Sequence, residues 1–442
     1  AIDAAGARKM HLYLASNDTD LPWTGIFTGL IILHLYYWGT NQFIVQRALG
    51  ARSDSEARMG IVSAGYLKLL IPFYAIGTGI AAYYLFQEHL ADRIVAPDTA
   101  FPELVKLVVP AGFGLVGLIS AGLIGAIMSS IDSMMNAAAT IVSVDIYRKY
   151  FDPQAGDRTM IFVGRLAIVF FVVTAALMAI FLLDPNSERN FFLIIVDHSG
   201  HLIPGLLVAF LMGMFWRRGT GTAAVVTIVA AVVYSGLLDA AYTRQFGMPP
   251  AVYSVVTGQK SLNQLKVREL PEGFADMPLL ERNEYLAREG ERINDVNAFL
   301  GPKLNLFHRV ALVIALSVAT FVVVSLITRP DAEKGRLVWS DLGGHQPGDL
   351  RNLFGSIFLS IILFGFLGRL LHGGRLSRYQ AGAIAVAWTV TLFFSGIQKA
   401  RRRRLAEGET VPSNPLVALL CEDRFWAGIL CSLAIYMHYH FY

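Results

Sequence analysis

The sequence predicts an all-α integral membrane protein, because it is apolar, poor in charge and divided into long apolar runs. Hydrophobic residues make up 55% of the 442 residues and charged residues only 16%, against about 25% charged residues in soluble domains. The mean hydropathy is +0.51. Runs of about 20 apolar residues are long enough to cross a bilayer as helices. They do not alternate as the strands of a membrane barrel would.

Ten segments are predicted to cross the membrane as helices. The third is too long for one perpendicular crossing, so we expect it to tilt or to continue beyond the bilayer. The segments are 23–47, 60–86, 111–146, 159–183, 189–215, 220–242, 305–328, 352–372, 381–398 and 416–440.

Basic residues concentrate in alternate connections, which predicts that these connections are cytoplasmic and that residues 1–22 form an external polar segment. The polar residues 243–303 then form an external, partly helical insert. Arg375 and Arg378 speak against this orientation. The basic connections hold Arg47, Arg52 and Arg58; Arg148, Lys149 and Arg158; Arg217 and Arg218; Arg329, Lys334 and Arg336; and the run KARRRR at 399–404.

Several function classes receive no support from the sequence. A net charge of +4 gives no case for a nucleic-acid partner. The two cysteines, Cys421 and Cys431, have no metal-binding spacing. The run GFGLVG at 112–117 lacks the strand and the acidic residue of a dinucleotide-binding motif, so no organic cofactor is expected.

The first segment carries the polar and aromatic cluster LHLYYWGTNQF at 33–43, where a membrane span is normally most apolar. A discontinuous helix lining a cavity explains such a cluster, because unwound backbone is tolerated only away from lipid. Gly39 and Thr40 could ease the unwinding, and the side chains of Asn41 and Gln42 could bind the freed backbone.

A stripe of hydrogen-bonding side chains runs along 118–150. Its members recur at helical spacing, so they share one face that must meet other helices or a cavity. Interhelical hydrogen bonding is one interpretation. The adjacent hydroxyls of Ser129 and Ser130 suggest another, an all-oxygen site for a small monovalent cation. The stripe consists of Ser129, Ser133, Asn136, Thr140 and Ser143.

Two further polar groups fall inside predicted spans. Lys68 lies about eight residues into its segment, which at 1.5 Å per residue is about 12 Å deep. An ionisable residue at such a depth indicates a functional site or a structural ion pair. Asp197, His198 and His201 lie together in another span, where His198 and His201, spaced i, i+3, could share a metal, but no third ligand appears at suitable spacing. Helix capping or a polar pathway wall is the interpretation we favour for them.

The chain resembles the sodium/solute symporter family, which includes the sodium–glucose cotransporters. The resemblance rests on LPWTGIFTGLIILHLYYWGTNQFIVQRALGARSDSEARMG, YLKLLIP, GAIMSSIDSMMNAAATIVSVDIYRKY and PGLLVAFLMGMFWRR. It covers about residues 20–240 continuously and, more weakly, the run VVVSLITRP that ends at 330. It implies two five-helix inverted repeats with a midplane site built from broken helices. Residues 331–442 have no counterpart in it.

The resemblance also implies a domain organisation. Residues 23–215 match the second five-helix repeat, and the first repeat, which would complete the site, is absent from these 442 residues. Residues 216–330 would add two transmembrane helices around the insert, and 331–442 a membrane extension of about three helices.

The resemblance assigns site residues one by one. Ser129 and Ser130 match hydroxyls that bind Na⁺, and Ala126 matches a residue that lends its carbonyl. Lys68 matches a lysine that hydrogen-bonds sugar. Tyr37 matches an aromatic inner gate beneath the sugar. The other matched substrate positions are Trp38, beside the gate, Asn41, His34 where a bacterial sugar carrier has Asn, and Val196 where sugar carriers have Gln.

The function implied is Na⁺-coupled symport of a small polar solute by alternating access, with a sugar or polyol favoured. The expected setting is the cell membrane, the inner membrane in a bacterium. A membrane sensor built on a symporter-like bundle is the alternative, although no signalling domain occurs in the chain. An intramembrane enzyme using Asp197, His198 or His201 would need a nucleophile that the sequence does not show, so we expect no enzyme.

Overall fold

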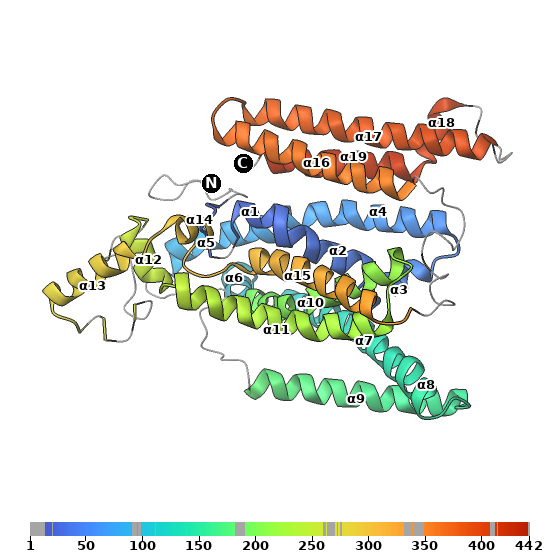
Figure 1. Cartoon of the computed structure of the whole chain (residues 1–442), viewed down its shortest axis with the longest axis horizontal. Coiled ribbons are helices and arrows are strands. Elements are labelled where there is room, and N and C mark those ends of the chain that lie inside the picture. The colour runs from blue at the N-terminus through green and yellow to red at the C-terminus, as the bar shows by residue number, and fades with distance from the viewer. Residues whose placement is uncertain are drawn as a thin grey trace. The chain divides into compact units, whose positions relative to one another are not determined.

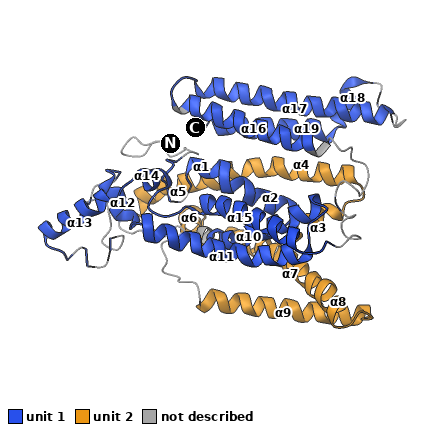
Figure 2. Cartoon of the chain, in the orientation of Figure 1, with its two compact units in different colours: residues 1–40, 195–442 blue, residues 41–194 orange. Residues whose placement is uncertain are grey.

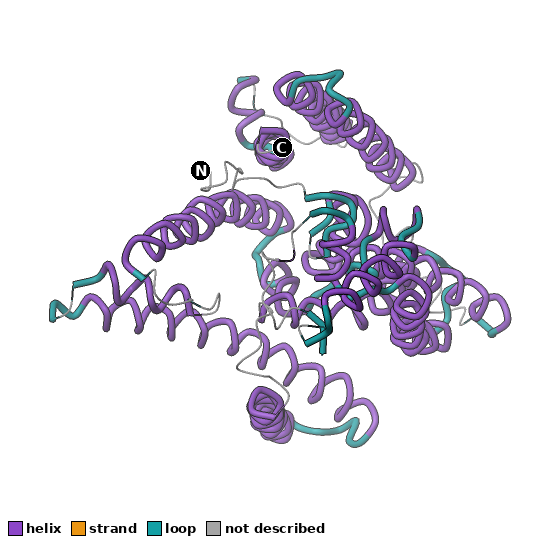
Figure 3. The backbone as a smooth tube through the Cα atoms, turned by 90° about the vertical axis from the view of Figure 1, so that its left-hand side faces the viewer, coloured by secondary structure: helices purple, strands orange, loops and turns teal. Residues whose placement is uncertain are grey.

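The chain folds into helices, as the sequence predicts (Figure 1). In this computed structural model, strands do not occur among the residues that are described, and only an isolated bridge joins Leu14 to Pro22. Figure 3 shows the helices linked by loops and turns. The described residues are 14–19, 21–90, 95, 99–110, 112–181, 191–259, 262, 270–271, 273–274, 276–330, 338, 349–406, 412 and 414–440.

The chain divides into two compact units (Figure 2). Unit 1 comprises residues 1–40 and 195–442, and unit 2 comprises residues 41–194. The chain therefore passes from one unit to the other twice, at 40/41 and at 194/195. Both passages fall close in sequence to predicted site residues.

Unit 2 contains three helical segments longer than 20 residues, of which the first is interrupted by a proline. Pro72 cannot donate an amide hydrogen bond to the preceding turn, and the helix widens there into the π-helical turn η2. Ser53 caps the start of this helix through the Glu56 amide. The elements are α3 Gln42–Leu49, α4 Asp54–Ile71, η2 Pro72–Ile76, α5 Gly77–His89, α6 Ala100–Val108, α7 Leu115–Thr140, η4 Ile141–Tyr147, α8 Arg148–Tyr150 and α9 Asp157–Phe181.

Unit 1 has one core between α10, α11 and α15, where Val208, Ala223 and Phe321 are buried together. A second core lies among the C-terminal helices, around Leu367, Ala385 and Tyr439. The elements are α1 Trp23–Gly25, η1 Ile26–Leu30, α2 Ile31–Gly39, α10 Phe191–Phe215 (which begins just before the boundary), α11 Gly221–Phe246, α12 Pro250–Val256, α13 Leu279–Glu291, α14 Asp295–Leu300, α15 Leu306–Ile327, α16 Asp349–His372, α17 Arg378–Ala406, α18 Pro415–Leu420 and α19 Asp423–His440.

Eight helices among the described residues are long and apolar enough to cross a membrane. They correspond to all the predicted spans except the first and the last. The first is divided at residues 40 and 41, as the sequence indicated. The last was predicted wrongly as one span over 416–440. It is two helices, because the chain turns at Cys421 and Glu422, where the Glu422 carboxylate forms an ion pair with Arg404 at 2.8 Å.

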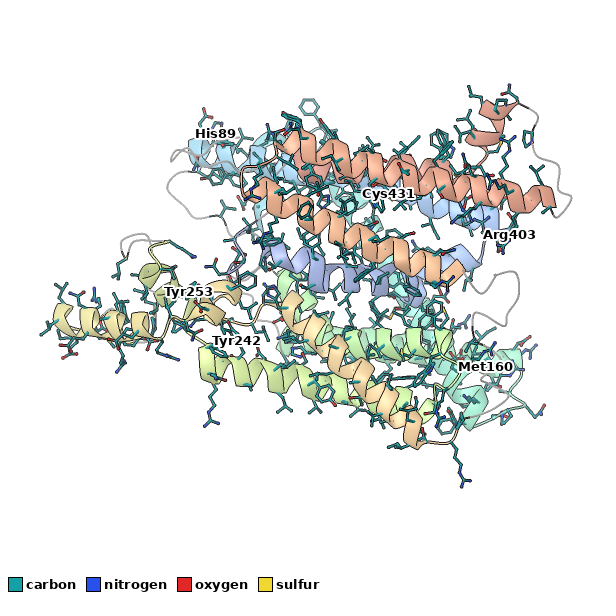
Figure 4. All side chains as sticks on the ribbon, turned by 45° about the horizontal axis from the view of Figure 1, so that its top comes forward. His89, Met160, Tyr242, Tyr253, Arg403 and Cys431 are labelled. Carbon is teal, nitrogen blue, oxygen red and sulfur yellow. The ribbon has the colours of Figure 1, made fainter. Side chains whose placement is uncertain are left out.

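The insert at 243–303 is partly helical, as predicted, and is tied to the rest of unit 1 by tyrosines (Figure 4). The Tyr242 hydroxyl donates to the carbonyl of Gly301 at 2.6 Å. The Tyr253 hydroxyl donates to the carbonyl of Asn297 at 2.9 Å and accepts from the Asn17 amide at 3.1 Å. These bonds hold the insert against the end of α11 and against the chain that leads into α1.

Close packing of α1 and η1 on α15 depends on one glycine in each of the two, Gly25 and Gly29. A Cβ on Gly25 would lie 2.8 Å from Cδ2 of Phe307, and a Cβ on Gly29 would collide with the Phe307 backbone. Beside them, Thr24 Oγ1 and His308 Nε2 share a hydrogen bond of 2.7 Å. The first broken helix is thus fixed to α15 at a contact that admits no side chain.

We expect Gly29→Ala to lower the stability of the protein by about 1–3 kcal/mol, because the added methyl meets backbone that cannot rotate away. Thermal unfolding of the detergent-solubilised protein measures this effect. Gly79→Ala in α5 is the matched control, since a Cβ there meets nothing within 4 Å. Equal unfolding midpoints for the two variants would contradict the packing described here.

Candidate functional site

The first candidate feature is the break between α2 and α3. Thr40 has φ −129° and ψ −15°, and Asn41 has φ −73° and ψ 113°. The Thr40 amide and hydroxyl both donate to the Tyr36 carbonyl at 3.0 Å. The main-chain carbonyl of Asn41 accepts from Ile44 and Val45. The predicted break is therefore confirmed, but the Asn41 side chain forms no cap, and the Thr40 hydroxyl binds the backbone instead.

Three predicted substrate residues occupy the last two turns of α2, before the break. The exposed His34 ring shares a hydrogen bond of 2.8 Å between Nδ1 and the Leu30 carbonyl. The rings of Tyr37 and Trp38 meet edge to face, with centroids 5.6 Å apart. Val196 is half-buried near the start of α10. All four belong to unit 1 and lie close in sequence to its two passages into unit 2.

Asn41 and Lys68 belong to unit 2. Asn41 starts α3, and Lys68 lies in the last turn of α4, just before the π-helical turn that Pro72 causes. The Lys68 side chain is exposed. Turns of this kind are frequent at functional sites, and here the turn follows a cationic side chain inside a helix that could span a membrane.

The predicted sodium ligands lie on α7. The Ser130 hydroxyl donates to the Ala126 carbonyl at 3.1 Å, so the structure brings two of the three proposed ligand groups together. Ser129, the third, directly precedes Ser130 in the sequence. The Ser129 carbonyl accepts from the Ser133 hydroxyl at 2.9 Å. Ala126, Ser129 and Ser130 are all exposed. The group is neutral and offers only oxygen, a ligand type that suits a hard cation.

The rest of the polar stripe satisfies its hydroxyls mostly within the helix. Thr140 donates to Asn136 at 2.8 Å, and Ser143 donates to Ala139 at 2.7 Å. Ser133 also accepts from the Arg47 guanidinium of α3. Ser143 is buried, close to where Ala139 packs on Gly164 of α9. The lower part of the stripe therefore serves helix packing, whereas the part with the serine pair is uncovered by the described residues.

An ion-paired cluster between α10, α11 and α15 was not predicted from the sequence. Arg309 Nη2 lies 2.6 Å from Oδ1 of Asp197, and Nη1 lies 3.7 Å from Oδ1 of Asp239. The arginine side chain is 5% exposed, whereas the two carboxylates are 30% and 48% exposed. The sequence feature that could have indicated this cluster is the pair His308–Arg309, which lies inside the apolar run at 305–328. Asp197 is thus an ion-pair partner rather than a helix cap.

A metal centre finds no support among the described residues. Nowhere in them do three or more His, Cys, Asp or Glu side chains gather so that they could hold a metal ion.

Comparison with known proteins gives a family match and several relatives. The model of the sodium:solute symporter family matches residues 2–230, which is 229 of the 442 residues. A sodium/glucose cotransporter of Vibrio parahaemolyticus is 38% identical over 53% of this chain and 45% of its own length. A sodium/myo-inositol cotransporter 2 of Mus musculus is 34% identical over 47% of this chain and 32% of its own.

A sodium/mannose cotransporter of Bos taurus is 34% identical over 48% of this chain and 37% of its own length. The chain therefore matches less than half the length of each of these relatives. Family and relatives are transporters by name, in agreement with the expectation that the chain is no enzyme.

Proposed function

The chain belongs to the sodium:solute symporter family, and from that premise we propose that its residues 23–215 form the second five-helix repeat of a Na⁺-coupled symporter for a small polar solute. A sugar or polyol is the solute class we favour, because the relatives are named for glucose, myo-inositol and mannose. The proposed setting is the cell membrane, which the eight candidate membrane-spanning helices support at the level of a multi-pass membrane protein.

The observation that carries this proposal is the break at Thr40 and Asn41. A helix that unwinds in the middle of a span frees backbone groups, which are tolerated in a membrane only at a cavity. Tyr37 and Trp38 precede the break with two ring faces, and rings of this kind can cover the apolar face of a pyranose or cyclitol. Their positions support an inner gate at Tyr37 beneath a bound solute.

Sodium is proposed to bind at Ser129, Ser130 and the carbonyl of Ala126. Binding would favour the outward-open, substrate-competent state, since a ligand shifts an equilibrium toward the state that it binds better. The solute then binds, Tyr37 closes over it, and rocking of the repeats exposes both ligands to the cytoplasm. Loss of Na⁺ to the sodium-poor interior releases the solute.

A first five-helix repeat is the partner that this proposal requires. In the helical segment Leu115–Tyr150, none of the most apolar 18-residue window is buried. Yet α7 carries the hydroxyls of Ser129 and Ser130 and the amide of Asn136 on exposed positions. Polar side chains in a membrane normally face other helices or a cavity. This supports a neighbouring repeat against that face of α7.

Solute uptake into proteoliposomes tests the proposed function. The protein reconstituted is the whole transporter, that is, this chain together with the proposed first repeat. An inward Na⁺ gradient should drive accumulation of at least one labelled solute from a panel of glucose, mannose, myo-inositol and sialic acid. An inward K⁺ gradient of the same size should not drive accumulation of any of these solutes. Equal uptake with both cations for every solute would argue against symport and in favour of a sensor built on the same helices.

Within this proposal, Lys68→Gln should weaken the apparent affinity for the solute by about 10- to 100-fold. A hydrogen bond from a charged donor contributes about 1.5–3 kcal/mol, and each 1.4 kcal/mol is a factor of ten. The solute concentration at half-maximal uptake measures the loss. Lys106→Gln is the control, because the Lys106 side chain is 71% exposed and pairs with Glu103. An equal loss of apparent affinity in both variants would contradict the proposal that Lys68 belongs to the substrate site.

A further inference from the structure

The C-terminal helices α16, α17 and α19 lie outside the range that matches the family model. They have their own core, in which Leu367 and Leu371 of α16 pack with Ala381 and Ala385 of α17 and with Tyr439 of α19. At Gly428 the helices approach closely, since a Cβ there would lie 3.0 Å from Cβ of Phe393. This part of unit 1 therefore has a defined shape whose role the symporter match leaves open.

An apolar groove of about 400 Å³ lies between α17, α18 and α19, on the side where Phe393 meets Gly428. Its volume falls within the range of small-molecule sites, about 300–1,000 Å³. Ser432 contributes a hydroxyl that has no hydrogen-bond partner among the described residues. Nearly all the other lining side chains are hydrocarbon, as at Val390, Phe394 and Ile429.

α17 ends in a basic turn that contains Arg403, which Figure 4 labels. Val386, Val390, Phe393 and Ile397 line the groove at spacings of four, three and four. The alternation continues to Ala400 and Arg404, and Arg401 lies one turn beyond Ile397, so both arginines fall near this face of the helix. Arg401, Arg402 and Lys399 are exposed.

Across the groove, α19 adds one more cation at the same end. Arg424 Nη1 donates to the Gly396 carbonyl at 2.8 Å, which fixes its guanidinium beside α17. Arg404 is paired with Glu422 at 2.8 Å. This end of the helices holds six basic residues and two acidic ones among those described. The basic residues are Lys399, Arg401, Arg402, Arg403, Arg404 and Arg424; the acidic ones are Glu422 and Asp423.

We propose that this groove binds an anionic phospholipid, with an acyl chain along Val390 and Ile429 and the phosphate headgroup against Arg401, Arg402 and Arg424. The two halves of the surface match the two halves of that ligand. A hydrocarbon groove along α17, a helix long and apolar enough to cross a membrane, accepts an acyl chain, and a cluster of arginines at the end of that helix attracts an anionic headgroup. The basic run is also the one predicted to face the cytoplasm.

A neutral lipid or a sterol would fill the groove without using the arginines, and free phosphate would use the arginines without filling the groove. Each therefore leaves half of the surface unexplained. Two arginines at a membrane surface contribute about 1 kcal/mol each. Removing both should weaken the preference for an anionic over a zwitterionic lipid by about 25-fold.

Native mass spectrometry of the full chain in detergent tests the proposal, with equimolar phosphatidylglycerol and phosphatidylcholine of identical acyl chains. The parent should retain phosphatidylglycerol preferentially. Arg401→Gln with Arg402→Gln should lower that preference by about 25-fold. Arg369→Gln with Arg375→Gln removes the same charge from exposed positions near the other end of α17 and should leave it intact. Equal retention of both lipids by the parent would overturn the proposal.

The acyl half of the site is tested separately. Val390→Trp, which fills the groove, should lower retention of both lipids, whereas Ile384→Trp on an exposed position outside the groove should not. Circular dichroism of each variant checks that the helices are retained. If Val390→Trp binds lipid as the parent does, or if inorganic phosphate alone displaces phosphatidylglycerol completely, the groove is not the acyl site and the proposal fails.

Discussion

Replacing both serines of α7 in the whole transporter, Ser129→Ala with Ser130→Ala, is expected to abolish the sodium dependence of solute uptake. One Na⁺ that moves down a tenfold gradient and 100 mV supplies about 1.4 kcal/mol and about 2.3 kcal/mol. Together these sustain an accumulation of about 500-fold. Without the hydroxyls, only the Ala126 carbonyl remains of the proposed ligand set in this chain, and uptake should fall to passive equilibration.

Accumulation ratios in proteoliposomes under imposed Na⁺ and K⁺ gradients give the measurement. Thr174→Ala is the matched control, because the Thr174 hydroxyl on α9 is exposed and donates to the carbonyl of Phe170 at 2.8 Å, as Ser130 does to Ala126. Its accumulation ratio should equal that of the parent. If sodium-driven accumulation persists in the double-serine variant, the proposal that Ser129 and Ser130 bind the coupling Na⁺ is contradicted.

The second large effect is expected at Arg309, whose buried guanidinium lies between the carboxylates of Asp197 and Asp239. Arg309→Met should lower the free energy of unfolding by about 3–5 kcal/mol, because it leaves carboxylates without their cation in a part-buried site. The thermal unfolding midpoint of the detergent-solubilised protein measures it. The contact joins α10 to α15 and α11, so the loss should also expose these helices to proteolysis.

A double variant separates the ion pair from simple loss of packing. Asp197→Leu together with Arg309→Met replaces the closest pair by apolar side chains, which is often close to neutral when a buried ion pair is removed whole. The double variant should therefore be more stable than Arg309→Met alone. If it is less stable by the sum of the two single effects, the 2.6 Å contact contributes no coupling.

Much of the fold follows from patterns that a single helix displays by itself. Apolar run length predicted the eight helices among the described residues that are long and apolar enough to cross a membrane. The break at Thr40 was visible because polar residues inside a span contradict the run around them. The turn at Cys421 and Glu422 was missed for the opposite reason. Glu422 at this turn pairs with Arg404 of another helix, a contact between helices that apolar run length does not predict.

The candidate site divides in the same way. The hydrogen bond from Ser130 to Ala126 is local to one helix, and helical spacing alone places the two residues one turn apart. Arg309 could not be paired from the sequence, since its partners Asp197 and Asp239 lie on two other helices. The closeness of Gly29 to Phe307 is equally a property of tertiary packing. The local periodicity of a sequence predicts single helices, but it does not predict which side chains of distant helices come into contact.

Solute-evoked sodium flux tests the central proposal of coupled symport most directly. Proteoliposomes that contain the whole transporter would be given labelled Na⁺ outside, with and without the solute that the uptake panel identifies. Coupling through Ser129 and Ser130 predicts that the solute accelerates Na⁺ entry in the parent and leaves it unchanged in the double-serine variant. Sodium entry in the parent that is the same with and without solute would contradict the proposal.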